Sequence, residues 1–202
     1  MSALHVAAGL ATAGMVALAV ATRWRRVQQV DDALERFAGA HRERAVPFAR
    51  IGTLPGERYV HPLIGALSAC AVLLARPHGG AMRALVPLAG ASLGAIVAHH
   101  AVKLVYPRPR PAIALSRGKT EPAFPSGHTA DATAVVLTSA YLLVREGMLP
   151  PTVALPVAVL IALVTGLSRV ALGWHWGTDV VGGWLTGIAV AAECAALYEG
   201  MR

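Results

Sequence analysis

The fold is decided by residues 152–198, which read TVALPVAVLIALVTGLSRVALGWHWGTDVVGGWLTGIAVAAECAALY. Two apolar runs, residues 152–172 and residues 176–198, flank a short turn that contains Gly173, Trp174, His175, Trp176 and Gly177. About 20 helical residues are enough to cross the roughly 30 Å hydrocarbon core of a bilayer. Each run has that length, so the stretch predicts two membrane-spanning helices joined by a tight turn.

The rest of the chain repeats this pattern. Of its residues, 55% are hydrophobic and only 14% are charged, which lies outside the usual balance of a soluble protein. Turn residues separate the apolar segments, as at residues 76–80. The sequence therefore predicts an all-α integral membrane protein, one domain over residues 1–202, whose remaining transmembrane helices cover residues 3–22, 60–75, 83–104 and 127–144, six helices in all.

The first of these segments has an alternative interpretation as a cleaved signal peptide, because Ala19-Val20-Ala21 resembles a cleavage site. No Lys or Arg precedes the apolar run, whereas a signal peptide begins with basic residues. We therefore expect a membrane span.

An amphipathic segment follows the first span. Apolar residues recur there at helical spacing among charged ones: Val27, Val30, Leu34, Phe37 and Ala38. This pattern predicts a helix at about residues 27–46 that lies at the membrane interface. A solvated helix in a loop is the alternative.

The net charge of +7 does not indicate a nucleic-acid partner. The basic residues are confined to the connections between apolar segments and are not interleaved with exposed aromatic residues. The expected partners are the bilayer itself and an anionic lipid, and the sequence leaves the oligomeric state open.

Six crossings place the connections after the first, third and fifth spans on one side of the membrane. That side collects the unusual residues, which are Lys103, Arg110, Ser126, Gly127, His128, Arg169, His175 and Asp179. Charged groups near a bilayer are costly to retain unless they bind something. We expect these distant segments to meet.

Each of these residue types has a task if the ligand is a phosphate. Lys103, Arg110 and Arg169 supply positive charge and hydrogen-bond donors. Ser126 is a suitable N-cap for the fourth span, which leaves the backbone N–H groups of Gly127 and the next residue at a helix N-terminus, a natural anion site.

The remaining residues fit covalent catalysis. His175 and Asp179 are four apart at the expected start of the sixth span, so they should share a helical face, where the carboxylate orients the imidazole. His175 is then a candidate nucleophile. His128 is left to act as general acid and then as general base.

Together these residues resemble the three-part signature of the type 2 phosphatidic acid phosphatase superfamily. The three parts are Lys103-x6-Arg110-Pro111, Pro125-Ser126-Gly127-His128 and Ser168-Arg169-x5-His175-x3-Asp179. The resemblance implies a six-helix core, no metal or other cofactor, and a phosphate held by Lys103, Arg110, Ser126, Gly127, His128 and Arg169. It also implies that His175 is the nucleophile, Asp179 its partner and His128 the acid and base.

Three polar residues within the apolar segments stay open to two interpretations. His99 and His100 lie in the third span with no cysteine or carboxylate at ligand spacing, which favours a hydrogen-bonded structural role over a metal site. Asp131 lies one turn after His128 and is either a functional carboxylate or a residue at the aqueous edge.

The sequence thus predicts a metal-independent lipid phosphatase of the cell membrane, most consistent with a bacterial inner membrane. The candidate substrates are a polyprenyl-phosphoryl sugar phosphate, a prenyl diphosphate, phosphatidylglycerophosphate and phosphatidic acid. The excess of Arg on the side that bears the signature predicts a cytoplasmic active site. The alternatives are a non-catalytic lipid transporter or flippase with a basic pocket and, less favoured, a vanadate-dependent haloperoxidase.

Overall fold

A computed structural model describes residues 2–75 and 81–202, so the turn expected at residues 76–80 lies outside the described residues. Within the described part, the chain forms helices and no strands. The elements are α1 (Ala3–Ala21), α2 (Arg25–Gly52), the 3-10 turn η1 (Leu54–Gly56), α3 (Val60–Ala75), α4 (Ala81–Val105), α5 (Ala112–Ser116), α6 (Gly127–Arg145), α7 (Pro151–Ala171) and α8 (Gly177–Gly200).

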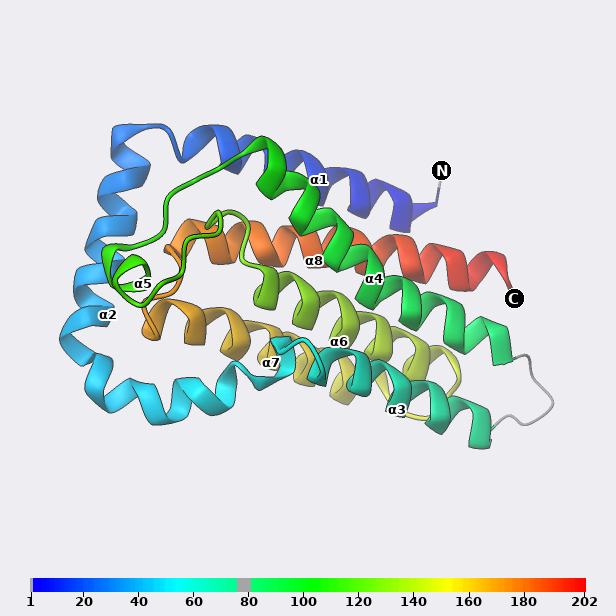
Figure 1. Ribbon diagram of the computed structural model, residues 1–202. Coiled ribbons are helices and arrows are strands. Elements are labelled where there is room, and N and C mark those ends of the chain that lie inside the picture. Colours follow the sequence, from blue (N-terminus) through cyan, green and yellow to red (C-terminus); the bar gives the residue numbers. More distant parts are fainter. Residues whose placement is uncertain (1, 76–80) are drawn as a thin grey trace.

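The long helices form a bundle that α2 closes at one end. Helices α1, α3, α4, α6, α7 and α8 run along a common direction, while α2 crosses the end of the bundle where α5 also lies (Figure 1). Both chain termini lie at the opposite end (Figure 1). The connection between α4 and α6 therefore shares its end of the bundle with α2 and with the turn before α8.

Helix α6 is the central helix, and small residues let α8 approach it closely. Helix α6 packs against α3, α4, α7 and α8. A Cβ at Gly183 of α8 would lie 2.7 Å from the backbone oxygen of Ser126, and one at Gly187 would lie 2.7 Å from that of Ala130. Such contacts are possible only for glycine, as is common where membrane helices pack.

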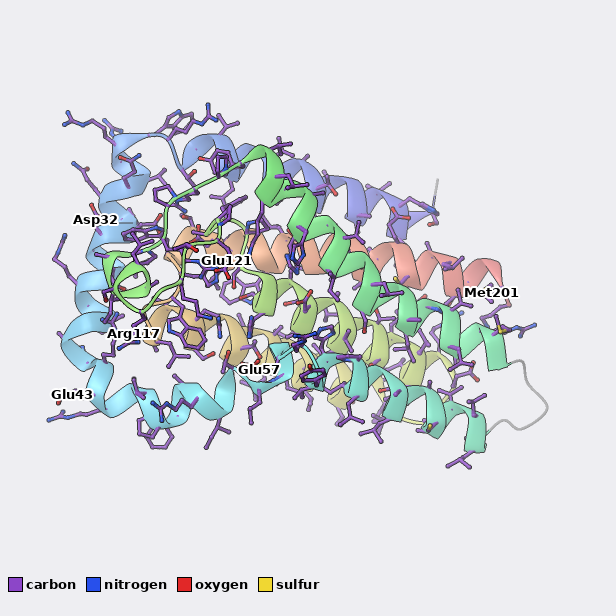
Figure 2. All side chains as sticks on the ribbon, in the orientation of Figure 1. Asp32, Glu43, Glu57, Arg117, Glu121 and Met201 are labelled. Atoms are coloured by element: carbon purple, nitrogen blue, oxygen red, sulfur yellow. The ribbon has the colours of Figure 1, made fainter. Side chains whose placement is uncertain are left out.

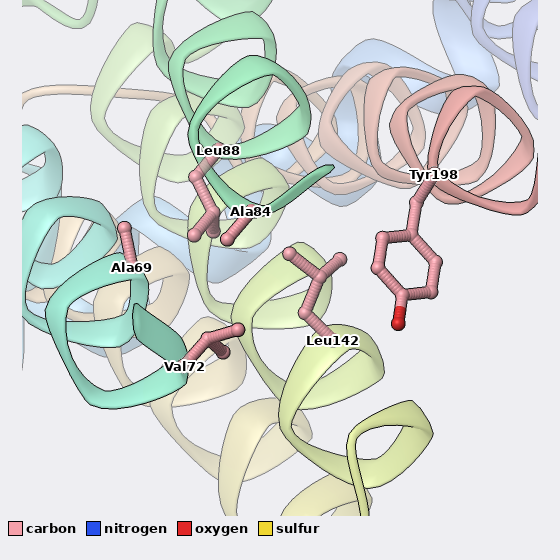
Figure 3. Close-up of a cluster of buried hydrophobic side chains, with 6 residues drawn as sticks. All are labelled: Ala69, Val72, Ala84, Leu88, Leu142 and Tyr198. Atoms are coloured by element: carbon pink, nitrogen blue, oxygen red, sulfur yellow. The ribbon is translucent and has the colours of Figure 1, made fainter. Parts of the chain in front are cut away.

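Near the end that carries the termini, the bundle is held by apolar contacts. Buried side chains from α3, α4, α6 and α8 converge there (Figure 3): Ala69, Val72, Ala84, Leu88, Leu142 and Tyr198. This cluster packs the four helices together at the end remote from α2.

Among the described residues, four helices are long and apolar enough to cross a membrane: Ala3–Ala21, Met82–Val105, Pro151–Ala171 and Gly177–Gly200. Val60–Ala75 is a shorter apolar helix. Helix α6 carries buried polar residues such as Thr129, Asp131 and Thr133, because its neighbours shield it on all sides. The protein is an all-helical membrane protein in which each segment expected as a span forms a helix.

Candidate functional site

A cavity of about 800 Å³ opens at the end of the bundle that α2 crosses. Glu57 and Glu121 lie near this end, far from Met201 (Figure 2). Six residues of the predicted site line the cavity: Lys103, Arg110, Gly127, His128, Arg169 and His175. The other two, Ser126 and Asp179, lie fully buried behind it.

His175 is almost completely buried, with 2% of its surface exposed. Arg110 Nη1 lies 3.1 Å from His175 Nε2. A guanidinium can only donate, so Nε2 is the acceptor and the ring proton sits on Nδ1. Burial, followed by the charges of Arg110, Arg169 and Lys103, lowers the pKa of His175 well below its usual value. The ring is therefore neutral, with a lone pair on Nε2.

Asp179 faces the other nitrogen of the same ring. Its Oδ2 lies 3.5 Å from His175 Nδ1 and accepts a hydrogen bond of 2.9 Å from the backbone N–H of Trp176. The expectation of a shared helical face was wrong, because α8 begins at Gly177 and His175 precedes it. Asp179 is instead the third residue of α8, and its side chain accepts from the backbone N–H of the N-cap residue, Trp176. This capping contact turns the carboxylate back toward the ring of His175.

Arg108 and Asp31 hold the Asp179 carboxylate in place. Arg108 donates to Asp179 Oδ1 and to Asp31 Oδ2, each at 2.6 Å. Asp31 is 1% exposed and also accepts from the backbone N–H of Thr178 at 3.0 Å and from its hydroxyl at 2.6 Å. Helix α2 is thus joined to the start of α8 by an ion-pair chain.

His128 is the second residue of α6 and lines the same cavity. Its Nε2 lies 3.2 Å from Oε1 of Glu57, which follows η1. Both side chains are partly exposed, and η1 packs on α6 so closely that a Cβ at Gly56 would overlap His128. Glu57 therefore contacts the predicted general acid and base directly.

The first residues of α6, Gly127 and His128, line the cavity, and Ser126 lies buried just before them. Ser126 occupies the N-cap position, but its hydroxyl makes no capping bond and instead accepts from Thr129 Oγ1 at 2.9 Å. Ser126 is therefore the N-cap residue, as predicted, but without a capping bond from its side chain. Gly127 has no room for a side chain, since a Cβ would lie 3.0 Å from His99 Cε1.

Arg169 and Lys103 complete the positive lining of the cavity. Arg169 is 3% exposed, donates to Thr53 Oγ1 at 2.7 Å and lies 4.2 Å from the centre of the Trp174 ring. Lys103 is half-buried in the last turn of α4. With Arg110, these side chains place three cations around one cavity, an arrangement suited to a phosphate group.

Three more polar residues meet in the cavity one helical turn inward. His99 Nε2 lies 3.3 Å and His61 Nε2 4.0 Å from the Asp131 carboxylate. Asp131 therefore lies within the helix bundle, 7% exposed. Among the described residues, no group of three or more His, Cys, Asp and Glu side chains has an arrangement that could hold a metal ion.

Sequence reasoning missed Asp31, Glu57 and His61. Asp31 and Glu57 lie in a charged connection where many similar residues face solvent, and His61 stands alone at the start of an apolar run. Arg108 lies within the signature segment, but at one of the six unspecified positions between Lys103 and Arg110. No local signal marks these residues, because each acts through a partner distant in sequence.

Comparison with known proteins identifies the family of this chain. The model of the PAP2 superfamily matches residues 84–200. Phosphatidylglycerophosphatase B of Bacillus subtilis (strain 168) is 30% identical over 178 residues, which cover 85% of this chain and 84% of that protein. The crystal structure of a transmembrane PAP2 type phosphatidylglycerolphosphate phosphatase from Bacillus subtilis superposes with a TM-score of 0.79 at 25% identity, covering 96% of this chain and 97% of the other.

Proposed function

The chain belongs to the PAP2 superfamily and is a membrane lipid phosphatase, and we propose that it removes the terminal phosphate of phosphatidylglycerophosphate through a phosphohistidine on His175. The observation that carries the proposal is the contact of His175 Nε2 with Arg110. It presents an unprotonated nitrogen to a cavity lined by cations. The curated relative described above supports the choice of lipid among the candidates.

In the first step, Nε2 of His175 attacks the phosphorus, a nitrogen–phosphorus bond forms and the bond from phosphorus to the lipid oxygen breaks. Asp179, whose Oδ2 lies 3.5 Å from the protonated Nδ1, stabilises the positive charge that develops on the imidazole. Lys103, Arg110, Arg169 and the N-terminus of α6 neutralise the phosphoryl oxygens.

His128 supplies the proton that the leaving lipid alkoxide requires. Its Nε2 lies 3.2 Å from Oε1 of Glu57, so this carboxylate is placed to stabilise the imidazolium form that gives up the proton. In the second step, His128 takes a proton from water, the hydroxide attacks the phosphorus and the bond to His175 breaks. Inorganic phosphate then leaves and His175 returns to its neutral form.

We further propose six membrane spans, α1, α3, α4, α6, α7 and α8, with α2 at the interface. Both chain termini lie at one end of the bundle, as an even number of crossings requires (Figure 1). Helix α2 exposes large apolar side chains toward its surroundings, including Phe37 at 67% and Phe48 at 78%. Such a surface suits the boundary between head groups and acyl chains.

The excess of Arg at the end crossed by α2 supports a cytoplasmic active site. The two termini then face outward. A reporter that is active only outside the cytoplasm, fused after Arg202, should be active, whereas activity of a cytoplasm-specific reporter at the same position would reverse the orientation.

The function is tested by phosphate release in detergent from phosphatidylglycerophosphate, phosphatidic acid, a prenyl diphosphate and a polyprenyl-phosphoryl sugar phosphate. We expect the first to be the preferred substrate. Brief reaction with ³²P-labelled substrate should label the protein through an acid-labile, alkali-stable bond that is lost in His175→Ala. His41→Ala, which changes an exposed histidine on α2, is the control. A labelled His175→Ala protein, or an alkali-labile bond, would refute the phosphohistidine.

Metal independence has its own experiment. Activity should survive EDTA, because the cations of Lys103, Arg110 and Arg169 occupy the place that a metal would take beside the phosphate. Loss of activity in EDTA that Mg²⁺ restores would contradict this part of the proposal.

A further inference from the structure

A polar cluster lies in the same cavity as His175, beyond the part assigned to the phosphate. We call His61, His99 and Asp131 the inner cluster. All three line the cavity and are 1%, 5% and 7% exposed, respectively. They come from α3, α4 and α6, so three helices bring them together.

The inner cluster adjoins the phosphate site. His99 lies one turn before Lys103 on α4, and Asp131 lies one turn after Gly127 on α6, a separation of about 5.4 Å along each helix. The ring of His99 closes directly against Gly127, where a Cβ would be 3.0 Å from Cε1. A group attached to the phosphate through a short carbon arm can therefore reach the inner cluster.

The inner cluster has unused hydrogen-bonding capacity. In the described part of the chain, His61 Nδ1 and His99 Nδ1 are buried without a hydrogen-bond partner, and Asp131 Oδ1 makes no hydrogen bond beyond its 3.3 Å contact with His99 Nε2. Leaving such atoms unpaired in a protein interior costs about 1–3 kcal/mol each, and more in a membrane-embedded segment. A polar ligand that satisfies them offsets that cost.

The chemistry of the inner cluster selects a neutral hydroxyl over a second phosphate. It contains a carboxylate and two imidazoles but no Lys or Arg, so an anion there would be repelled by Asp131. A hydroxyl can donate to the Asp131 carboxylate and accept from an imidazole N–H. Among the described residues, no group of three or more His, Cys, Asp and Glu side chains could hold a metal ion at this place instead.

We propose that the inner cluster binds the hydroxyl of the leaving alcohol, next to the carbon that bears the scissile phosphate. This inference rests on the proposed function, in which the leaving alcohol is a phosphatidylglycerol with one free hydroxyl on its central glycerol carbon. The diacylglycerol that leaves phosphatidic acid has none. The inner cluster is thus a specificity site that separates a polyol phosphate from a hydroxyl-free lipid phosphate.

The test compares two substrates that differ by one oxygen atom: phosphatidylglycerophosphate and its deoxy analogue, in which propane-1,3-diol replaces the head-group glycerol. We expect wild-type kcat/KM to be higher for the glycerol substrate by about tenfold or more, as for a hydrogen bond to a charged group. In Asp131→Asn the ratio should fall toward one. Glu193→Gln is the control, because it changes another carboxylate within an apolar helix, and it should keep the wild-type ratio.

Each outcome separates the two proposals. Wild-type activity that is equal on both substrates overturns the inner-cluster assignment, needs no variant to fold and leaves the phosphatase proposal intact. A wild-type preference that persists in Asp131→Asn places the hydroxyl elsewhere and also overturns it. A purely structural role for Asp131 lowers both activities by the same factor and leaves the ratio unchanged. Failure of the wild type to hydrolyse phosphatidylglycerophosphate overturns the proposed substrate, and this inference with it.

Discussion

Replacing Asp179 by Asn should reduce turnover by reversing the proton position on His175. Arg108 donates to Asp179 Oδ1 at 2.6 Å, a charge-assisted bond that is stronger than the bond of 2.9 Å from the Trp176 N–H to Oδ2, so the oxygen of the substituted amide should face Arg108 and the bond from Trp176 should be lost. The amide nitrogen then points at His175 Nδ1 and requires an acceptor there. The ring proton moves to Nε2, which removes the lone pair and sets an N–H against Arg110.

The expected loss is large. In a serine protease triad, the same change of an orienting Asp to Asn costs about 10⁴ in kcat through the wrong tautomer, equivalent to ~5.5 kcal/mol of barrier. The fold should survive, because Arg108 keeps its second ion pair with Asp31 at 2.6 Å. The loss of stability should therefore stay below the ~3–5 kcal/mol typical of a buried charge left wholly unpaired.

The assay is phosphate release in detergent for Asp179→Asn, Asp179→Ala and the control Asp32→Asn, with thermal unfolding measured for each. Asp32 is the exposed neighbour of Asp31 on α2 and should tolerate the change. Asn and Ala remove the same charge, but only Asn imposes the wrong tautomer, so Asn should be at least as damaging as Ala. A folded Asp179→Asn protein within tenfold of wild type, or one clearly more active than Asp179→Ala, would refute the reasoning.

Three further predictions concern the same site and its support. Burial and nearby cations lower the pKa of His175 in the folded protein. As the pH falls through about 6.5, this side chain therefore takes up a proton only in the unfolded chain, and the free energy of unfolding of the wild type should decrease. His175→Gln should lose less between pH 7 and pH 5, and equal losses of melting temperature would contradict this. Arg110→Lys should lower kcat/KM by about 100-fold, since one ammonium cannot replace bonds to Glu121 O, Trp174 O and His175; near-normal activity would show that charge alone suffices. Gly183→Ala should destabilise by about 1–3 kcal/mol, while Gly9→Ala, with open space around it, should not, and equal melting temperatures would count against the close packing.

The sequence identified the helices well because most of them are continuous apolar segments. Apolar length alone marked the segments that became α1, α3, α4, α7 and α8. The segment expected as an amphipathic helix at about residues 27–46 is helical, but the helix runs from Arg25 to Gly52, since it continues through Pro47. Such an extension depends on packing against α7 and not on local preference.

The sequence predicted those site residues whose chemical type alone suggests a role at a phosphate. Lys103, Arg110, His128, Arg169 and His175 do share one cavity. What the sequence could not supply was the contacts between distant segments. Glu57 contacts His128. Asp31 contacts Thr178, which lies 147 positions later in the chain. The roles of Asp131 and His99 also stayed open, because neither spacing nor composition brings His61 from α3 to join them.

The ion-pair chain from Asp31 through Arg108 to Asp179 has a practical consequence for anyone who transplants this domain. The family match begins at residue 84, yet Asp31 lies on α2, well before it. A chimera that kept residues 84–200 and borrowed its first helices from another protein would leave Arg108 with one acidic neighbour instead of two. Unless the donor brings a carboxylate to the same place, the hybrid should assemble with a disturbed Asp179, and restoring that single acid should be a quicker repair than redesigning the cavity.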